Sequence, residues 1–171
     1  AAALDSPRTT VLSIPVDLAT PDVVWTRVSR MLDQPGLHHI VTLNPEQIMA
    51  AQTDQFLAQS IAAADLITID GIGLELALRI AGVGPVGRVT GVDLVEGLAQ
   101  RGVPLFLLGG APGAAEEARS QLTTRFAAAR IAGAWSGGRA AAFDDRQTMD
   151  RIRDSGARVV AVAYGAPTQN Q

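Results

Sequence analysis

The chain has 171 residues, of which 47 % are hydrophobic and 4 % aromatic, and its formal net charge is −3. This length suggests a single domain whose core is built from aliphatic side chains. The sequence contains no Cys and no Lys, and its two His are adjacent. Disulfides, thiolate–zinc sites, a Walker P-loop, a lysine Schiff base and a multi-histidine metal cage are therefore excluded.

Charge pattern and hydropathy narrow the class of protein further. The arginines are scattered along the chain, so no basic patch for a nucleic acid is indicated. No apolar run approaches the ~20 residues that a membrane helix needs, and Ala1–Pro7 lacks the basic stretch typical of a signal peptide. We expect a cytoplasmic protein without a nucleic-acid partner.

The first half of the chain alternates β-type and α-type segments. Strands are predicted at Thr10–Val16, His38–Leu43 and Leu66–Ile69, and helices at Pro21–Leu32, from Pro45 onward and at Leu74–Ile80. Asn44 precedes Pro45, and Gln47 follows at the third helical position, which is typical of a capped helix start. We expect His38 and His39 to lie inside their strand in structural roles, one pointing inward and the other outward.

The second half continues the same alternation. Strands are predicted at Val103–Leu108, Arg130–Ala134 and Arg158–Tyr164, and helices at Val92–Gln100, Ala114–Ala128 and Asp144–Asp154. Buried strands separated by helices indicate a mostly parallel sheet with helices on both faces. The predicted fold is a single Rossmann-like α/β domain over residues 9–171, preceded by a poorly ordered segment, residues 1–8.

Sheets of this kind bind ligands outside the carboxyl ends of their strands. Four predicted strand ends carry polar or glycine-rich segments: Thr42-Leu43-Asn44-Pro45-Glu46, Asp70-Gly71-Ile72-Gly73, Gly109-Gly110-Ala111-Pro112-Gly113 and Gly165-Ala166-Pro167-Thr168-Gln169. Candidate functional residues are therefore sought in these four segments.

Asp70 is the strongest candidate for chemistry. It ends an apolar strand, and Gly71 behind it lets a ligand approach the backbone closely. Such a carboxylate is suited to act as a general base. An equally weighted alternative is that Asp70 only caps the helix that begins at Ile72.

Other strand ends offer groups for a nucleotide or a sugar. The loop Gly109–Gly113 joins a strand to a helix, so its N–H groups could hold a diphosphate at the positive end of the helix dipole, or the loop could be an ordinary tight turn. Thr42 and Asn44 could offer a hydroxyl and an amide to a sugar, although Asn44 also suits a helix cap. An NAD fingerprint is lacking, because Leu76 stands in place of the third glycine.

Metal-dependent phosphate chemistry is disfavoured. The chain has no Asp-x-Asp element that would hold a divalent cation against a nucleotide diphosphate. The pair Asp144-Asp145 opens a predicted helix and is better explained as a cap with first-turn charge. We therefore expect no metal and no cofactor.

Taken together, five segments in this order resemble the WecG/TagA/CpsF glycosyltransferases. The similarity runs from about Val11 to the end of the chain. Its motifs are Val41-Thr42-Leu43-Asn44-Pro45-Glu46, Asp70-Gly71-Ile72-Gly73, Arg88-Val89-Thr90-Gly91-Val92-Asp93-Leu94, Leu107-Leu108-Gly109-Gly110-Ala111-Pro112-Gly113 and Gly165-Ala166-Pro167-Thr168-Gln169.

The resemblance implies an inverting, metal-independent transferase of teichoic acid or related polysaccharide biosynthesis. Its donor would be a UDP-sugar of the N-acetylmannosamine type. Its acceptor would be N-acetylglucosamine on a polyprenyl diphosphate (undecaprenyl) lipid, at the inner face of the cell membrane. The main alternative is a non-catalytic nucleotide-sugar-binding module that keeps the family fold.

The resemblance also implies roles for individual residues. Asp70 matches the catalytic base, and Thr42, Asn44 and Gln169 match polar positions that orient the donor sugar. The donor-binding candidates are Gly71, Thr90, Gly91, Asp93, Gly109, Gly110, Gly113 and Gly137. For the glycine loop, this role rests on the helix-terminus argument more than on the family.

The chain departs from the family pattern near its end. The family continues its last motif as Pro-Lys-Gln-Glu and then into a basic, membrane-seeking segment, whereas this chain reads Pro167-Thr168-Gln169-Asn170-Gln171. We expect the chain alone to be weakly active or inactive, and expect peripheral membrane association only with such a segment. The Gly-Tyr-Phe that often follows the fifth strand is here Gly137-Gly138-Arg139. A homo-oligomer is compatible with the Ala-rich helices.

Overall fold

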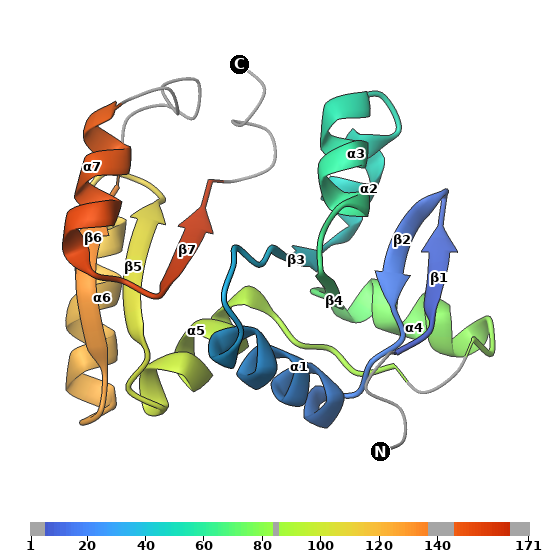
Figure 1. Cartoon of the computed structure of the whole chain (residues 1–171). Coiled ribbons are helices and arrows are strands. Elements are labelled where there is room, and N and C mark those ends of the chain that lie inside the picture. Colours follow the sequence, from blue (N-terminus) through green and yellow to red (C-terminus); the bar gives the residue numbers. More distant parts are fainter. Residues whose placement is uncertain (1–5, 84–85, 137–145, 165–171) are drawn as a thin grey trace. The chain divides into compact units, whose positions relative to one another are not determined.

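A computed structural model describes residues 6–83, 86–136 and 146–164 of the chain (Figure 1). It is an α/β fold, as predicted, and is consistent with a Rossmann-like domain. Its residues cluster into two compact units, Ala1–Gly91 and Val92–Gln171. Each unit has its own strands and helices and is described by itself.

The first unit begins with a β-hairpin. Strands β1 (Arg8–Val11) and β2 (Ile14–Asp17) pair antiparallel, and the chain reverses at Leu12 and Ser13, whose φ angles are 48° and 68°. The prediction of one strand over Thr10–Val16 is wrong, because this turn has none of the Gly, Asn or Asp residues that favour a positive φ. Residues 1–8 were expected to be poorly ordered. Arg8 nevertheless lies in β1, and Pro7 O accepts a hydrogen bond from Leu18 N.

A parallel strand pair forms the centre of the first unit. Strand β3 (Ile40–Leu43) pairs with β4 (Leu66–Ile69), with Thr42 opposite Thr68. Past the end of β4, an isolated parallel bridge joins Ile69 to Arg88. The prediction that His38 and His39 lie inside the strand is wrong, because β3 begins only at Ile40.

Four helices pack around these strands in the first unit: α1 (Pro21–Asp33), α2 (Pro45–Ala51), α3 (Gln55–Ala62) and α4 (Ile72–Ile80). All four residues of β4 are buried, as expected for a parallel strand covered on both faces. The core gathers aliphatic side chains from the strands and helices, including Val16, Leu43, Ile48, Ile61, Ile67 and Leu74.

An ionic cluster joins the hairpin and α1 to the start of β4. Asp17 is only 2 % exposed, and its Oδ1 accepts a hydrogen bond from Arg8 Nε at 2.9 Å and lies 3.5 Å from Arg27 Nη1. Its Oδ2 accepts from Ile67 N at 2.7 Å. The buried carboxylate is therefore fully used in the fold, at the amino end of β4.

The second unit is a three-stranded parallel sheet in the order β6-β5-β7. Its strands are β5 (Pro104–Gly109), β6 (Arg130–Trp135) and β7 (Val159–Ala163), and its helices are α5 (Gly91–Gln100), which starts on the last residue of the first unit, α6 (Ala114–Arg125) and α7 (Arg146–Ser155). Strand β5 is buried from Leu105 to Gly109, as its unbroken apolar run predicted. The ladder between β5 and β6 shifts register between Leu105 and Phe106.

Candidate functional site

Asp70 lies directly beyond β4, and its carboxylate does not cap α4. The N-cap of α4 is Gly71, with no side-chain capping bond, so the helix-cap alternative for Asp70 is wrong. Asp70 N donates to Leu43 O at 2.8 Å, which extends the β3–β4 pairing by one residue and fixes the Asp70 backbone. Its Oδ2 accepts a long hydrogen bond from Gly91 N at 3.4 Å. The half-buried carboxylate thus lies beside the start of α5.

The segment that leads into α5 is held against β4. Val89 N donates to Ile69 O at 3.0 Å, and the Thr68 hydroxyl donates to Val89 O at 2.8 Å. A Cβ built on Gly91 would lie 3.4 Å from Thr42 Oγ1. Gly91 therefore faces Thr42 of β3 and is hydrogen-bonded to Asp70 just beyond β4, and Thr90 beside it is buried.

Asn44 caps α2 in the manner that its sequence context predicts. Its Oδ1 accepts from Gln47 N at 2.8 Å, and Gln47 Oε1 accepts from Asn44 N at 3.0 Å, which together form a capping box. The capping interpretation of Asn44 is confirmed. Because Oδ1 faces the helix, the Asn44 amide N–H₂ is the part of the side chain that can donate to a ligand.

Gly71 lets the ends of β3 and β4 approach each other. Its φ angle is 131°, and a Cβ there would lie 3.4 Å from Pro45 Cδ. A side chain at this position would be strained and would contact the Pro45 ring. We call Thr42, Asn44, Asp70, Gly71 and Gly91 the β3–β4 edge site.

This edge site joins three kinds of polar group in one unit. A hydroxyl, an amide and a carboxylate lie at the carboxyl ends of two parallel strands, where α/β proteins bind ligands. The glycines leave the backbone open to close approach. The arrangement can bind a polyol and remove a proton from it.

Arg88 begins the third motif of the resemblance, but the sequence analysis gave it no role in the site. Its backbone bridges to Ile69, one residue before Asp70, and its side chain is exposed. The bridge therefore brings a cation to the same end of β4. Its signal in the sequence was its place in that motif beside Thr90 and Gly91, although an arginine there could equally form a surface pair with Asp93.

In the second unit, the backbone of the loop Gly109–Gly113 is already hydrogen-bonded. Gly110 N donates to Ala163 O, and Gly113 N donates to Ser136 Oγ, both at 3.0 Å. The buried Ser136 hydroxyl in turn donates to Glu116 Oε2 at 3.0 Å. These bonds favour the tight-turn interpretation, and a diphosphate site in this loop stays a prediction.

Close packing explains why this loop contains glycine. Gly109 has a φ of 101°, and a Cβ there would lie 3.1 Å from the carbonyl carbon of Ala163. Gly110 has a φ of 83°, and its Cβ would lie 3.0 Å from Ala114 Cβ. In addition, the first turn of α6 carries Glu116 and Glu117, whose charges oppose an anion at that helix end.

Three candidate residues remain: Asp93, Gln169 and Gly137. Asp93 is exposed in the first turn of α5. Gln169 and Gly137 lie outside the described residues. Within the described ranges, no cluster of three or more His, Cys, Asp or Glu could hold a metal ion, and no helix is long and apolar enough to cross a membrane.

In this α/β fold, a carboxylate, a hydroxyl and an amide lie at the carboxyl ends of two parallel strands, where such proteins bind ligands. The chain belongs to the glycosyl transferase WecG/TagA/CpsF family, whose model matches residues 9–171. The resemblance drawn from the five motifs is thereby confirmed. Membership of a glycosyltransferase family implies a nucleotide-sugar donor and an acceptor.

Proposed function

We propose that this chain is the core of a metal-independent, inverting glycosyltransferase in which Asp70 is the general base. One observation carries the proposal: the Asp70 carboxylate lies beside Gly91 at the end of β4 instead of capping α4. The bond that Oδ2 accepts from Gly91 N, the first residue of α5, is long, so the carboxylate can still take a proton. Thr42 and Asn44 lie at the end of the paired strand β3.

The proposed step is a single in-line displacement. Asp70 removes the proton from an acceptor hydroxyl while that oxygen attacks the anomeric carbon of the donor sugar. The new C–O bond forms as the bond from the anomeric carbon to the diphosphate oxygen breaks, and UDP leaves with the electron pair. Attack from the face opposite UDP inverts the anomeric centre.

Two side chains of the edge site suit the donor sugar. The Thr42 hydroxyl can donate or accept, and the Asn44 amide can donate, because its oxygen is held in the α2 cap. Arg88, at the same end of β4, supplies a cation for the leaving diphosphate. Gln169 is proposed as a further sugar contact on the resemblance alone.

The substrates follow from the resemblance to the family. The donor is proposed to be UDP-N-acetylmannosamine or a close relative, and the acceptor N-acetylglucosamine on an undecaprenyl diphosphate at the inner membrane face. Metal independence is supported by the lack of an Asp-x-Asp element in the sequence.

A single-turnover assay tests this function. The chain, in excess over radiolabelled UDP-N-acetylmannosamine, is mixed with a soluble diphosphate-linked N-acetylglucosamine acceptor in the presence of EDTA. Excess enzyme makes slow transfer visible. We expect a disaccharide product with inverted anomeric configuration, and equal yield with and without EDTA.

Two results would contradict the proposal. Donor binding by calorimetry with no transfer, even after a basic C-terminal segment of the family type is added, would identify a non-catalytic nucleotide-sugar-binding module. Transfer that stops in EDTA and returns with Mg²⁺ would contradict the metal-independent mechanism.

A further inference from the structure

Strand β4 is apolar except for one buried hydroxyl, that of Thr68. Thr68 is 3 % exposed, and the other residues of the strand are buried as well: Leu66, Ile67 and Ile69. A hydroxyl in such a place costs desolvation unless it is hydrogen-bonded. It donates to Val89 O at 2.8 Å, outside the strand pair. The bond therefore ties the core of the first unit to the segment that leads into α5.

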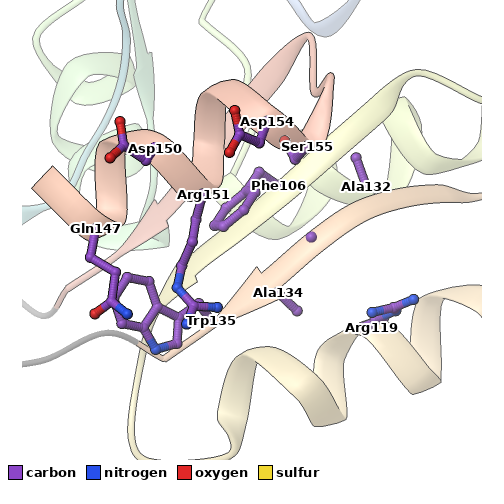
Figure 2. A pocket seen from close by; sticks show the side chains of 11 residues that line it. Phe106, Arg119, Ala132, Ala134, Trp135, Gln147, Asp150, Arg151, Asp154 and Ser155 are labelled. Atoms are coloured by element: carbon purple, nitrogen blue, oxygen red, sulfur yellow. The ribbon is translucent and has the colours of Figure 1, made fainter.

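Packing alone does not require this hydroxyl. Valine has nearly the shape of threonine and the same branching at Cβ, so it would fill the same position in a strand. The buried stretch of β5 in the second unit, Leu105–Gly109, has no polar side chain. Figure 2 shows its Phe106 ring among the side chains that line a pocket of that unit. The Thr68 hydroxyl is thus explained by the bond that it makes, not by the strand that carries it.

Two contacts between this strand end and the segment before α5 follow one register. The first joins the Thr68 hydroxyl to Val89 O. The second joins Asp70 Oδ2 to Gly91 N at 3.4 Å, and each contact spans 21 residues. Side chains two residues apart along an extended strand leave it on the same face, and Asp70 N keeps the extended pairing through its bond to Leu43 O. The hydroxyl and the carboxylate therefore contact the same segment at successive positions.

The direction of the Gly91 N–H depends on the carbonyl that Thr68 holds. Gly91 is the first residue of α5, so its N–H has no partner within the helix and can donate to a carboxylate. Only Thr90 lies between Gly91 and Val89. Because the Val89 carbonyl is held, the peptide groups that follow it have little freedom, and the N–H meets Asp70 from a fixed side.

Other contacts hold the segment in place without the Thr68 hydroxyl. Val89 N donates to Ile69 O at 3.0 Å. A Cβ on Gly87 would lie 2.5 Å from Pro21 Cδ, so the backbone there packs directly on the first residue of α1. Loss of the hydroxyl should therefore leave the segment attached and change only the part that follows Val89.

We propose that Thr68 is a positioning residue for the transfer reaction. By fixing Val89 O, it sets the Gly91 N–H against the Asp70 carboxylate, which keeps that carboxylate directed at the acceptor hydroxyl. The inference rests on the proposed function, because it takes Asp70 as the base. Thr68 is buried, so it acts through Asp70 and not on a substrate. A displaced base slows the chemical step, so the hydroxyl should affect the transfer rate and not the donor affinity.

Three variants of the full chain test the proposal. Thr68→Val removes the hydroxyl and keeps the shape, whereas Thr68→Ser keeps the hydroxyl and removes the methyl group. Ile67→Val is the matched control, because Ile67 is buried in the same strand and its side chain leaves the other face. Each variant should fold and lower the melting temperature by about 3 °C.

Only the loss of the hydroxyl should slow transfer. We expect Thr68→Val to slow single-turnover transfer about tenfold, with the donor dissociation constant within about twofold of the parent. Thr68→Ser and Ile67→Val should transfer within about twofold of the parent rate. A folded Thr68→Val variant that transfers at the parent rate, or a Thr68→Ser variant that is equally slow, would overturn the proposal.

A second measurement does not need transfer. NMR follows amide hydrogen exchange at Gly91 in the chain without substrate, and exchange should be about tenfold faster in Thr68→Val and within about twofold of the parent in the other two variants. Faster exchange in Thr68→Val, together with no transfer by the parent, would contradict the proposed function and support the placement of Gly91 by Thr68. Unchanged exchange in Thr68→Val would overturn the positioning role whether or not the parent transfers.

Discussion

The β3–β4 edge site and the Gly109–Gly113 loop both follow strands and carry similar polar or glycine-rich sequences. They differ in how many of their polar groups are hydrogen-bonded within the protein. At the β3–β4 edge site, folding uses the Asn44 oxygen and the backbone of Asp70, while the Asp70 carboxylate accepts a long hydrogen bond from Gly91 N and the Asn44 amide N–H₂ can still donate. In the Gly109–Gly113 loop, the N–H groups of Gly110 and Gly113 are already bonded to the protein. A strand end can therefore bind a ligand only through polar groups that are not fully hydrogen-bonded within the protein.

The largest effect on stability is expected at the amino end of β4, opposite the edge site. Asp17→Asn removes the charge that faces Arg8 and Arg27 and should lower the free energy of unfolding by about 3 kcal/mol. Urea denaturation measures this loss. Asp22→Asn, at an exposed position in α1, is the control and should cost under about 0.5 kcal/mol. Equal stability of the two variants would show that the Asp17 cluster contributes little.

Capping and ligand binding by Asn44 can be separated. Asn44→Ser keeps an N-cap acceptor and should change the free energy of unfolding by under about 0.5 kcal/mol, whereas Asn44→Ala should cost about 1 kcal/mol. Both lack the amide donor, so both should slow transfer about tenfold. Normal transfer by a folded Asn44→Ser variant would contradict the sugar contact.

Ser136 tests the interpretation of the glycine loop. Ser136→Ala removes the acceptor for Gly113 N and the donor to Glu116, and should cost about 1 kcal/mol in thermal or urea denaturation. Ser120→Ala, at an exposed position on α6, is the matched control and should be neutral. Because the loop is a turn in this account, donor affinity should stay within about twofold. Tighter donor binding after Gly113 N is freed would instead favour a diphosphate site in the loop.

The smallest expected effect concerns Tyr164, whose ring lies near Gly109 and which is the single tyrosine of the chain. Burial raises the pKa of Tyr164 above its ordinary value. Its contribution to stability is therefore complete below the ordinary tyrosine pKa and is lost as the pH rises through the higher folded value. Absorbance titration at alkaline pH should give a higher midpoint for the folded chain than for the urea-unfolded chain. Equal midpoints would contradict this.

Much of the fold could be predicted because continuous apolar runs mark buried parallel strands. Leu66–Ile69 and most of Val103–Leu108 are strands as predicted. The hairpin was missed because Leu12 and Ser13 adopt positive φ angles without the residues that normally signal such a turn. The strand start at Ile40 was missed because His38 and His39 were counted as part of the strand, although the apolar run begins only at Ile40.

The candidate site could be predicted only in part, because sequence shows neighbours along the chain and not across strands. The Asn44–Gln47 cap spans three residues and was visible as a motif. The contact between Asp70 and Gly91 spans 21 residues, and that between Gly113 and Ser136 spans 23. The first of these long-range contacts supports the assignment of Asp70 as the general base. The second provides an acceptor for Gly113 N, which the sequence suggested could bind a ligand.

The central claim is that the Asp70 carboxylate takes the acceptor proton. The most direct measurement compares single-turnover transfer rates of Asp70→Asn and the control Asp22→Asn, with melting temperatures taken on the same samples. We predict that Asp70→Asn slows transfer about 10²- to 10⁴-fold with an unchanged melting temperature, while Asp22→Asn transfers at the parent rate. A folded Asp70→Asn variant that transfers at the parent rate would contradict the account.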